Sequence, residues 1–147
     1  MSETRQIVCP HDGAVNRVPL ARLGDGPKCG KCHQVLFDGE PLELTAATFE
    51  RHLSQGQIPL LVDFWAPWCG PCRMMAPAYH EAAIQLEPLI RVAKVNTEDE
   101  PQLSSRFGIR SIPTLILFAG GREIARQSGA MSVAEQIVRW TQGSIPR

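Results

Sequence analysis

The pentapeptide WCGPC at residues 68–72 constrains the fold of this chain more than any other feature. It follows a nearly continuous apolar run at residues 59–65, which is typical of a strand covered on both faces. After it, apolar residues recur at helical spacing as far as Leu86. The two cysteines therefore lie between a buried strand and a helix, and Pro71 falls in the first helical turn, where proline is tolerated.

The spacing of Cys69 and Cys72 has two chemical interpretations. Two thiolates at this spacing can form half of a tetrahedral zinc site, but the other two ligands would have to come from distant residues. The predicted helix start instead places Cys69 beside unpaired N–H groups and the positive end of the helix dipole, which stabilise a thiolate. A redox couple needs such a nucleophile with a second thiol one turn behind it, so this context favours a redox pair.

Strands and helices alternate along the rest of the chain from residue 42. The predicted strands are 42–44, 59–65, 89–95, 114–118 and 123–127, with a hairpin turn at 119–121. The predicted helices are 46–54 with Thr45 as N-cap, 69–86, 99–107, and a last one that Ser132 caps and that ends near Gln142. This order predicts an α/β fold with a central mixed sheet flanked by helices on both faces.

Several separated motifs between residues 42 and 147 resemble the thioredoxin family. Residues 64–72, FWAPWCGPC, are similar to the active-site stretch of thioredoxins, and Asp63 stands in the strand before it. Further matches are Pro77 within the following helix, Lys94-Val95-Asn96 at the end of the next strand, the segment 107–114 with the cis-proline position Pro113, and the glycine turn Ser128-Gly129-Ala130. Because these motifs agree in order and spacing, the resemblance implies the thioredoxin fold.

The resemblance also implies roles for the matched residues. Cys69 would be the nucleophile and Cys72 the resolving thiol, while Asp63 would exchange a proton with Cys72 through water and Lys94 would pair electrostatically with Asp63. The expected substrate-binding residues are Trp68, Gly70, Pro71, Ile112, Pro113 and Gly129. Structural alternatives stay open: Asp63 as an edge or turn residue, Lys94 as a surface residue, and Pro113 as a block to edge pairing.

A second pair, Cys29 and Cys32, lacks the strand and helix that flank the first. Its partner half-site is CPHDG at residues 9–13, in which Asp12 stands where a zinc knuckle has its second cysteine. Sixteen residues separate Asp12 from Cys29, which fits the template of two Cys-x2-Cys pairs apart from that substitution. Aspartate can ligate zinc at about 2.0–2.2 Å, so the sequence predicts a zinc site made by Cys9, Asp12, Cys29 and Cys32.

Other ligand sets remain open at this stage. His11, His33 or a water molecule could complete a three-cysteine site, and the segment could also bind no metal. Residues 1–37 have little apolar periodicity, so bound zinc would supply the folding free energy that a core does not. Thioredoxins of the bacterial thioredoxin-2 type carry a similar N-terminal zinc ribbon-like module, and the resemblance includes LFDGE at 36–40. We predict a zinc-binding module at 1–37, a hinge at 38–41 and a thioredoxin domain at 42–147.

The resemblance implies a protein-disulfide reductase that acts on disulfide-containing proteins and is regenerated by thioredoxin reductase and NADPH, with no bound organic cofactor. One alternative is a binding or chaperone module whose zinc finger recruits partners. Another is a disulfide oxidase or isomerase, but the Gly-Pro dipeptide between the cysteines resembles reducing members of the family.

Composition bears on location and partners. The start of the chain is polar and leads into no apolar segment, and five cysteines suit metal ligands plus a redox pair in a reducing compartment, so we expect a cytoplasmic protein. The sequence contains no run of eighteen apolar residues, so we predict no membrane span. A formal net charge of zero and a first segment without interleaved aromatics give no strong nucleic-acid signal. We expect a monomer.

Overall fold

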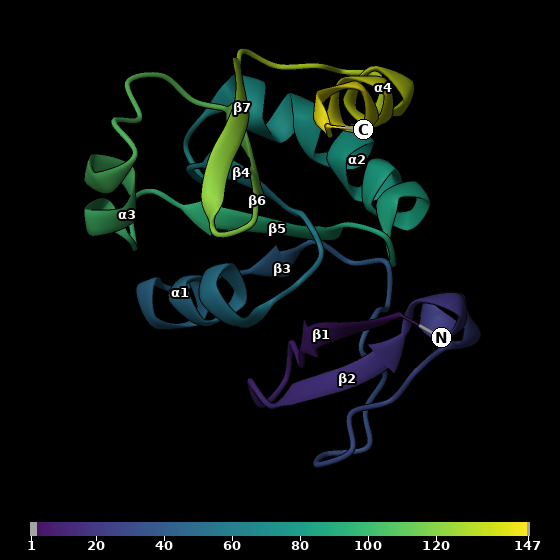
Figure 1. Cartoon of the computed structure of the whole chain (residues 1–147). Helices are drawn as coiled ribbons and strands as arrows, with labels where there is room; N and C mark the ends of the chain where they lie inside the picture. Colours follow the sequence, from purple (N-terminus) through teal and green to yellow (C-terminus); the bar gives the residue numbers. More distant parts are fainter. Residues whose placement is uncertain (1–2, 147) are drawn as a thin grey trace.

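The computed structural model describes residues 3–146, and its main body is a five-stranded mixed sheet with helices on both faces (Figure 1). The strands are β3 (Leu42–Glu43), β4 (Leu60–Trp65), β5 (Arg91–Asn96), β6 (Thr114–Ala119) and β7 (Arg122–Ser128). They lie in the order β3-β5-β4-β6-β7, and β4 pairs parallel with β5 and antiparallel with β6. All five predicted strands are confirmed, with ends that shift by one or two residues.

Four helices cover the sheet: α1 (Ala46–Gln55), α2 (Gly70–Leu86), α3 (Pro101–Arg106) and α4 (Ala134–Ser144). Side chains of α2 and α4 share one apolar core with one face of the sheet, and those of α1 and α3 share a second core with the other face. Strands β4 and β6 therefore have apolar side chains on both faces, which explains their continuous apolar sequences.

Two predicted helix caps have different outcomes. Thr45 caps α1 as expected, and its side chain forms a capping box with Thr48. Ser132 was expected to cap the last helix, and this is wrong: Val133 holds the N-cap position and makes no side-chain cap hydrogen bond. Burial of Ala134, Ile137 and Val138 against the sheet sets the start of α4, and packing thus overrides the local capping signal.

The N-terminal segment forms a β-hairpin followed by a short 3-10 helix. Strands β1 (Thr4–Val8) and β2 (Val15–Pro19) are antiparallel, and the 3-10 helix η1 spans Leu20–Asp25. A small core lies beneath them, made of Ile7, Cys9, Val18, Leu23, Cys29 and Leu36. The expectation that this segment has little core of its own must therefore be corrected. Each hairpin strand contributes only one or two apolar side chains, which is too few to produce a readable periodicity.

The hairpin module packs directly on the main body through backbone and side-chain hydrogen bonds. Gln6 and Gln57 exchange two of them, with donor–acceptor distances of 2.8 and 2.9 Å. In the connecting segment, the Gly39 N–H donates to Glu87 Oε1 at 3.2 Å. The boundaries at 1–37, 38–41 and 42–147 stay predictions, and residues 1, 2 and 147, which they include, lie outside the described residues.

Candidate redox site and metal cluster

Cys69 and Cys72 lie at the N-terminus of α2, as the sequence predicts, and they form a disulfide with a Cα–Cα distance of 5.2 Å. Cys69 is the N-cap residue, and its Sγ accepts a hydrogen bond of 3.2 Å from the Cys72 N–H. Only 4% of Cys69 and 3% of Cys72 are exposed. A thiolate at Cys69 would face the unpaired N–H groups of the first helical turn, which lower the pKa of a cysteine.

The loop that carries Pro113 lies against this dithiol. The carbonyl oxygen of Ile112 is 3.8 Å from Cys69 Sγ, and the Ile112–Pro113 peptide bond is cis. The Gly129 N–H donates a 2.9 Å hydrogen bond to the Pro113 carbonyl, and Gly129 has φ +101°, a conformation that favours glycine. Trp68, the residue before Cys69, is 64% exposed. The residues expected to receive substrate thus surround Cys69.

Asp63 lies in the centre of β4, with only 4% of its surface exposed. Its Oδ1 has no hydrogen-bond partner among the described residues. Burial raises the pKa of Asp63 to about 7, while the charge of Lys94 lowers it and that of Glu43 raises it. A carboxyl group that titrates near neutral pH suits proton exchange with a thiol.

A cavity of about 200 Å³ connects Asp63 with Cys72. Its lining consists of Glu40, Pro41, Asp63, Trp65, Cys72, Arg73, Ala76, Tyr79, His80 and Lys94. A water molecule needs only about 10–15 Å³ of such space, so the cavity can hold several. A proton can therefore pass between the Cys72 thiol and the Asp63 carboxylate through water, without a direct contact.

Lys94 lies next to Asp63 in the sheet, because these two residues are partners in the β4–β5 register. Its Nζ is 4.5 Å from the centroid of the Trp65 ring, and among residues 3–146 no ion pair joins it to Asp63. Lys94 therefore acts on Asp63 through its charge, which lowers the pKa of Asp63 without a direct ion pair. Glu43 is a neighbour that the sequence did not reveal, since nothing in a single acidic residue of an edge strand indicates what it faces.

The predicted metal ligands come together at the hairpin module. One ligand atom from each of Cys9, Asp12, Cys29 and Cys32 lies within 4.8 Å of all the others. Cys9 Sγ is 3.7 Å from Cys32 Sγ, and Cys29 Sγ is 3.7 Å from Asp12 Oδ1. Tetrahedral zinc with Zn–S bonds of about 2.3 Å requires sulfur atoms about 3.8 Å apart, so these four residues fit zinc.

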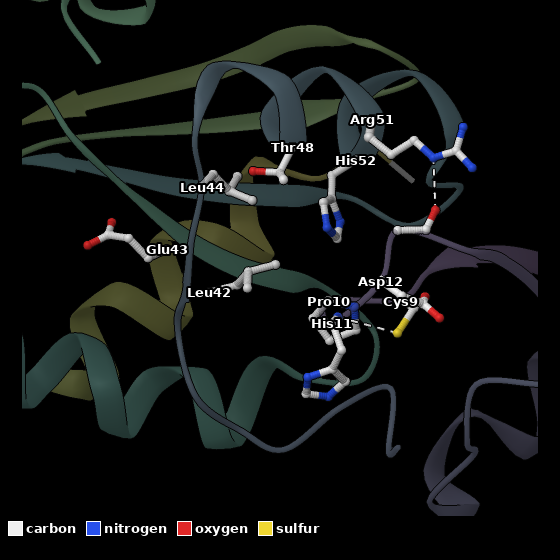
Figure 2. Close-up of a pocket in the computed structure, with 11 residues that line it drawn as sticks. Cys9, Pro10, His11, Asp12, Leu42, Glu43, Leu44, Thr48, Arg51 and His52 are labelled. Atoms are coloured by element: carbon white, nitrogen blue, oxygen red, sulfur yellow. Dashed lines mark hydrogen bonds between the residues drawn. The ribbon is translucent and has the colours of Figure 1, made fainter. Parts of the chain in front are cut away.

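The two histidines considered as alternative ligands do not join this group. The ring of His11 turns away from Cys9 (Figure 2), and its Nε2 lies 3.2 Å from the Val35 carbonyl oxygen. The backbone N–H groups of His11 and Lys31 donate instead to Cys9 Sγ and Cys29 Sγ, at 3.3 and 3.4 Å. These N–H groups stabilise thiolates, as outer-shell donors do around a metal.

A cavity of about 240 Å³ separates the CPHDG loop from α1 (Figure 2). Arg51 spans its edge and donates a 2.9 Å hydrogen bond to the Gly13 carbonyl. His52 points into the cavity, and burial, followed by the charges of Arg91 and Arg51, lowers its pKa to about 3. His52 is therefore neutral at physiological pH, and the loop is held on α1 by Arg51.

Comparisons with known proteins agree with both parts of the site. The thioredoxin family matches residues 40–142, and a zinc-ribbon family described as "Thioredoxin 2, N-terminal" matches residues 8–34. Thioredoxin C-3 of Corynebacterium nephridii is 48% identical over 129 residues, which are 88% of each chain. Thioredoxin 1 of Nostoc sp. is 52% identical over 89 residues, 60% of this chain and 83% of the relative.

Solved structures of other thioredoxins share the fold. The crystal structure of a Malassezia sympodialis thioredoxin superposes with a TM-score of 0.65 and 27% identity, covering 78% of this chain and 99% of that one. Chloroplastic thioredoxin z gives a TM-score of 0.64 at 26% identity, covering 71% and 94%. Among residues 3–146, no helix is long and apolar enough to cross a bilayer.

Proposed function

The chain belongs to the thioredoxin family of thiol-disulfide oxidoreductases, and we propose that it works as a protein-disulfide reductase whose dithiol is Cys69 and Cys72. The observation that carries this proposal is the cavity that Asp63 and Cys72 share, with the pKa of Asp63 raised to about 7. A carboxylate of this basicity can accept the Cys72 proton at neutral pH, which the second half of a disulfide exchange requires.

The proposed reaction has two steps. The Cys69 thiolate attacks one sulfur of a substrate disulfide, so that a mixed disulfide forms and the first substrate thiolate leaves. Asp63 then takes the Cys72 proton through cavity water, and the Cys72 thiolate attacks Cys69 Sγ. The second substrate thiolate leaves, and two electrons have passed from the dithiol to the substrate. Trp68 and the loop of Ile112 and Pro113 would bind the substrate chain around the reacting sulfur.

We further propose that Cys9, Asp12, Cys29 and Cys32 hold a structural zinc ion, which their ligand distances support. When bound, zinc would tie the two knuckles together and add folding free energy to a module with a small core. It has no part in the exchange reaction. The three free cysteines of this cluster need reducing surroundings to keep a metal, which supports a cytoplasmic location. A monomeric state stays a prediction.

Regeneration by thioredoxin reductase and NADPH belongs to the same proposal, and insulin reduction tests it. Turnover of insulin disulfides with NADPH and reductase should be measured for the intact chain and for Cys69→Ser, which should be inactive. Replacing the reductase by dithiothreitol separates the chemistry from the partner. Activity with dithiothreitol but none with NADPH and reductase would contradict regeneration by thioredoxin reductase. Activity that survives in Cys69→Ser would contradict the assignment of Cys69 to the reactive dithiol. A redox potential as oxidising as that of a disulfide oxidase would contradict the reducing direction.

A further inference from the structure

Glu43 reaches the redox site from the edge of the main sheet. Its carboxylate Oε2 accepts a hydrogen bond of 3.2 Å from the indole N–H of Trp65. In Figure 2 the Glu43 side chain points away from Asp12 and His11, although Glu43 also belongs to the lining of the cavity beside them. This contact joins residues 22 positions apart in the sequence, across two strands that are not neighbours in the sheet.

Trp65 is also held by a cation. The ammonium of Lys94 lies 4.5 Å from the centroid of its ring, close enough for a cation–π interaction. Lys94 is the register partner of Glu43 on one side and of Asp63 on the other, because β5 lies between β3 and β4. The indole therefore has a carboxylate at its N–H edge and a cation over its face, the first from β3 and the second from β5, the strand beside Asp63.

These groups border the space in which the proton moves. Trp65 and Lys94 line the cavity that joins Asp63 and Cys72. The charges of Lys94 and Glu43 act on the pKa of Asp63 in opposite directions, downward and upward. The other titratable or charged groups that line this cavity are Glu40, Arg73, Tyr79 and His80.

We propose that Glu43 is a positioning residue of the redox site, which orients Trp65 and Lys94 and sets the charge that Asp63 experiences. This inference rests on the proposed function, since it concerns the proton acceptor of Cys72. A fixed negative charge near a buried carboxylate opposes its ionisation. Burial is the largest influence on Asp63, and Glu43 adds to it by opposing the effect of Lys94.

Glu43→Gln tests the inference, because glutamine keeps an oxygen that accepts the indole hydrogen bond and removes only the charge. We expect the Asp63 titration midpoint to fall by roughly half a pH unit, which raises the ionised fraction about threefold below the midpoint. The midpoint is measured from the 13Cγ chemical shift of Asp63 in the full-length, zinc-loaded, reduced protein. The pH profile of insulin reduction should show the same displacement on its acidic side, and equal rates well above neutral pH.

Three further variants make the result decisive. Glu43→Leu removes both charge and hydrogen bond and should lower the midpoint as well, whereas Lys94→Gln should raise it. Glu81→Gln makes the same chemical change at an exposed position of α2 and should leave it unmoved. An Asp63 midpoint that Glu43→Gln does not lower would overturn the inference, even with insulin reduction intact. Absence of insulin reduction in the unmodified protein would instead overturn the proposed function, and the NMR titration would still report on Glu43.

Discussion

Arg91 Nη2 donates a hydrogen bond of 3.2 Å to the carbonyl oxygen of Val8, so strand β5 of the main sheet holds the residue that directly precedes Cys9. Arg91 is 5% exposed, and its guanidinium pairs with Glu87, whose Oε2 lies 3.5 Å from Nη1. Phe37 covers it, with 4.3 Å from the guanidinium carbon to the ring centroid. A buried ion pair thus lies between the hairpin module and the main body.

Arg91→Met should destabilise the protein strongly, because it leaves the Glu87 carboxylate buried without its cation. Breaking a buried pair in this way costs about 3–5 kcal/mol, and we expect the free energy of unfolding in urea to fall by that amount. Arg139→Met breaks the exposed pair with Glu135 and should have a far smaller effect. The double variant Arg91→Met/Glu87→Gln should recover much of the loss. An Arg91→Met variant as stable as Arg139→Met would contradict this assignment.

Asp63 should make the protein less stable as the pH rises from about 4 to about 7. Its pKa is about 7 in the folded chain, against about 3.9 for an unperturbed aspartate. Between these values the folded state holds a proton that the unfolded state releases, so stability falls with rising pH. The loss approaches roughly 4 kcal/mol above pH 7, and below pH 4 it vanishes because both states are protonated.

Urea unfolding of the oxidised protein at pH 4 and pH 8 measures this effect. The free energy of unfolding of Asp63→Asn, relative to that of the unmodified chain, should be higher at pH 8 than at pH 4. For the exposed control Asp99→Asn this difference should be the same at both pH values. A stability difference between Asp63→Asn and the unmodified chain that stays constant with pH would show that Asp63 titrates like an ordinary surface carboxylate.

Cys72→Ser should trap substrates on the protein. Without the second thiol, the mixed disulfide on Cys69 cannot resolve, and it should accumulate as a covalent adduct that dithiothreitol releases. Intact mass spectrometry after mixing with oxidised insulin measures the adduct. Cys69→Ser is the matched control and should form none, because Cys72 lies inside α2 and lacks the N-cap position that favours the Cys69 thiolate. More adduct on Cys69→Ser than on Cys72→Ser would show that Cys72 is the nucleophile and Cys69 the resolving thiol.

Asp12 should control how firmly zinc is held. Asp12→Ala should lower the zinc content of the purified protein and speed transfer of zinc to a chromogenic chelator, while Asp12→Cys should slow that transfer because a fourth thiolate binds zinc strongly. His11→Ala and His33→Ala should keep zinc at the level of the unmodified chain, because neither residue belongs to the cluster. Loss of zinc from a histidine variant, with retention in Asp12→Ala, would show that this histidine and not Asp12 is the fourth ligand.

The redox pair could be predicted from the sequence because the residues that define its surroundings are close together in the chain. The apolar run of β4, Cys69 at the N-cap and Pro71 in the first turn are consecutive, so one segment specifies strand, turn and helix start. The sequence also predicts that the two knuckles meet, since their internal spacing suits a tetrahedral ion, but it left the fourth ligand open between Asp12, His11, His33 and water. The hairpin module was underestimated because its small core combines single apolar side chains from several short segments.

The environment of Asp63 and the junction of the module were decided only by tertiary structure. Sequence placed Asp63 in an apolar strand, but its cavity, its unpaired Oδ1 and its neighbours depend on how β3, β5 and α2 pack around β4. Glu43 meets Trp65, and Arg91 meets Val8, across 22 and 83 residues of chain. The sequence by itself determined the reactive groups, because caps and knuckles are short-range geometry. The fold decided the charges that act on them, because electrostatic effects follow distance in space and burial, which strand register and packing set.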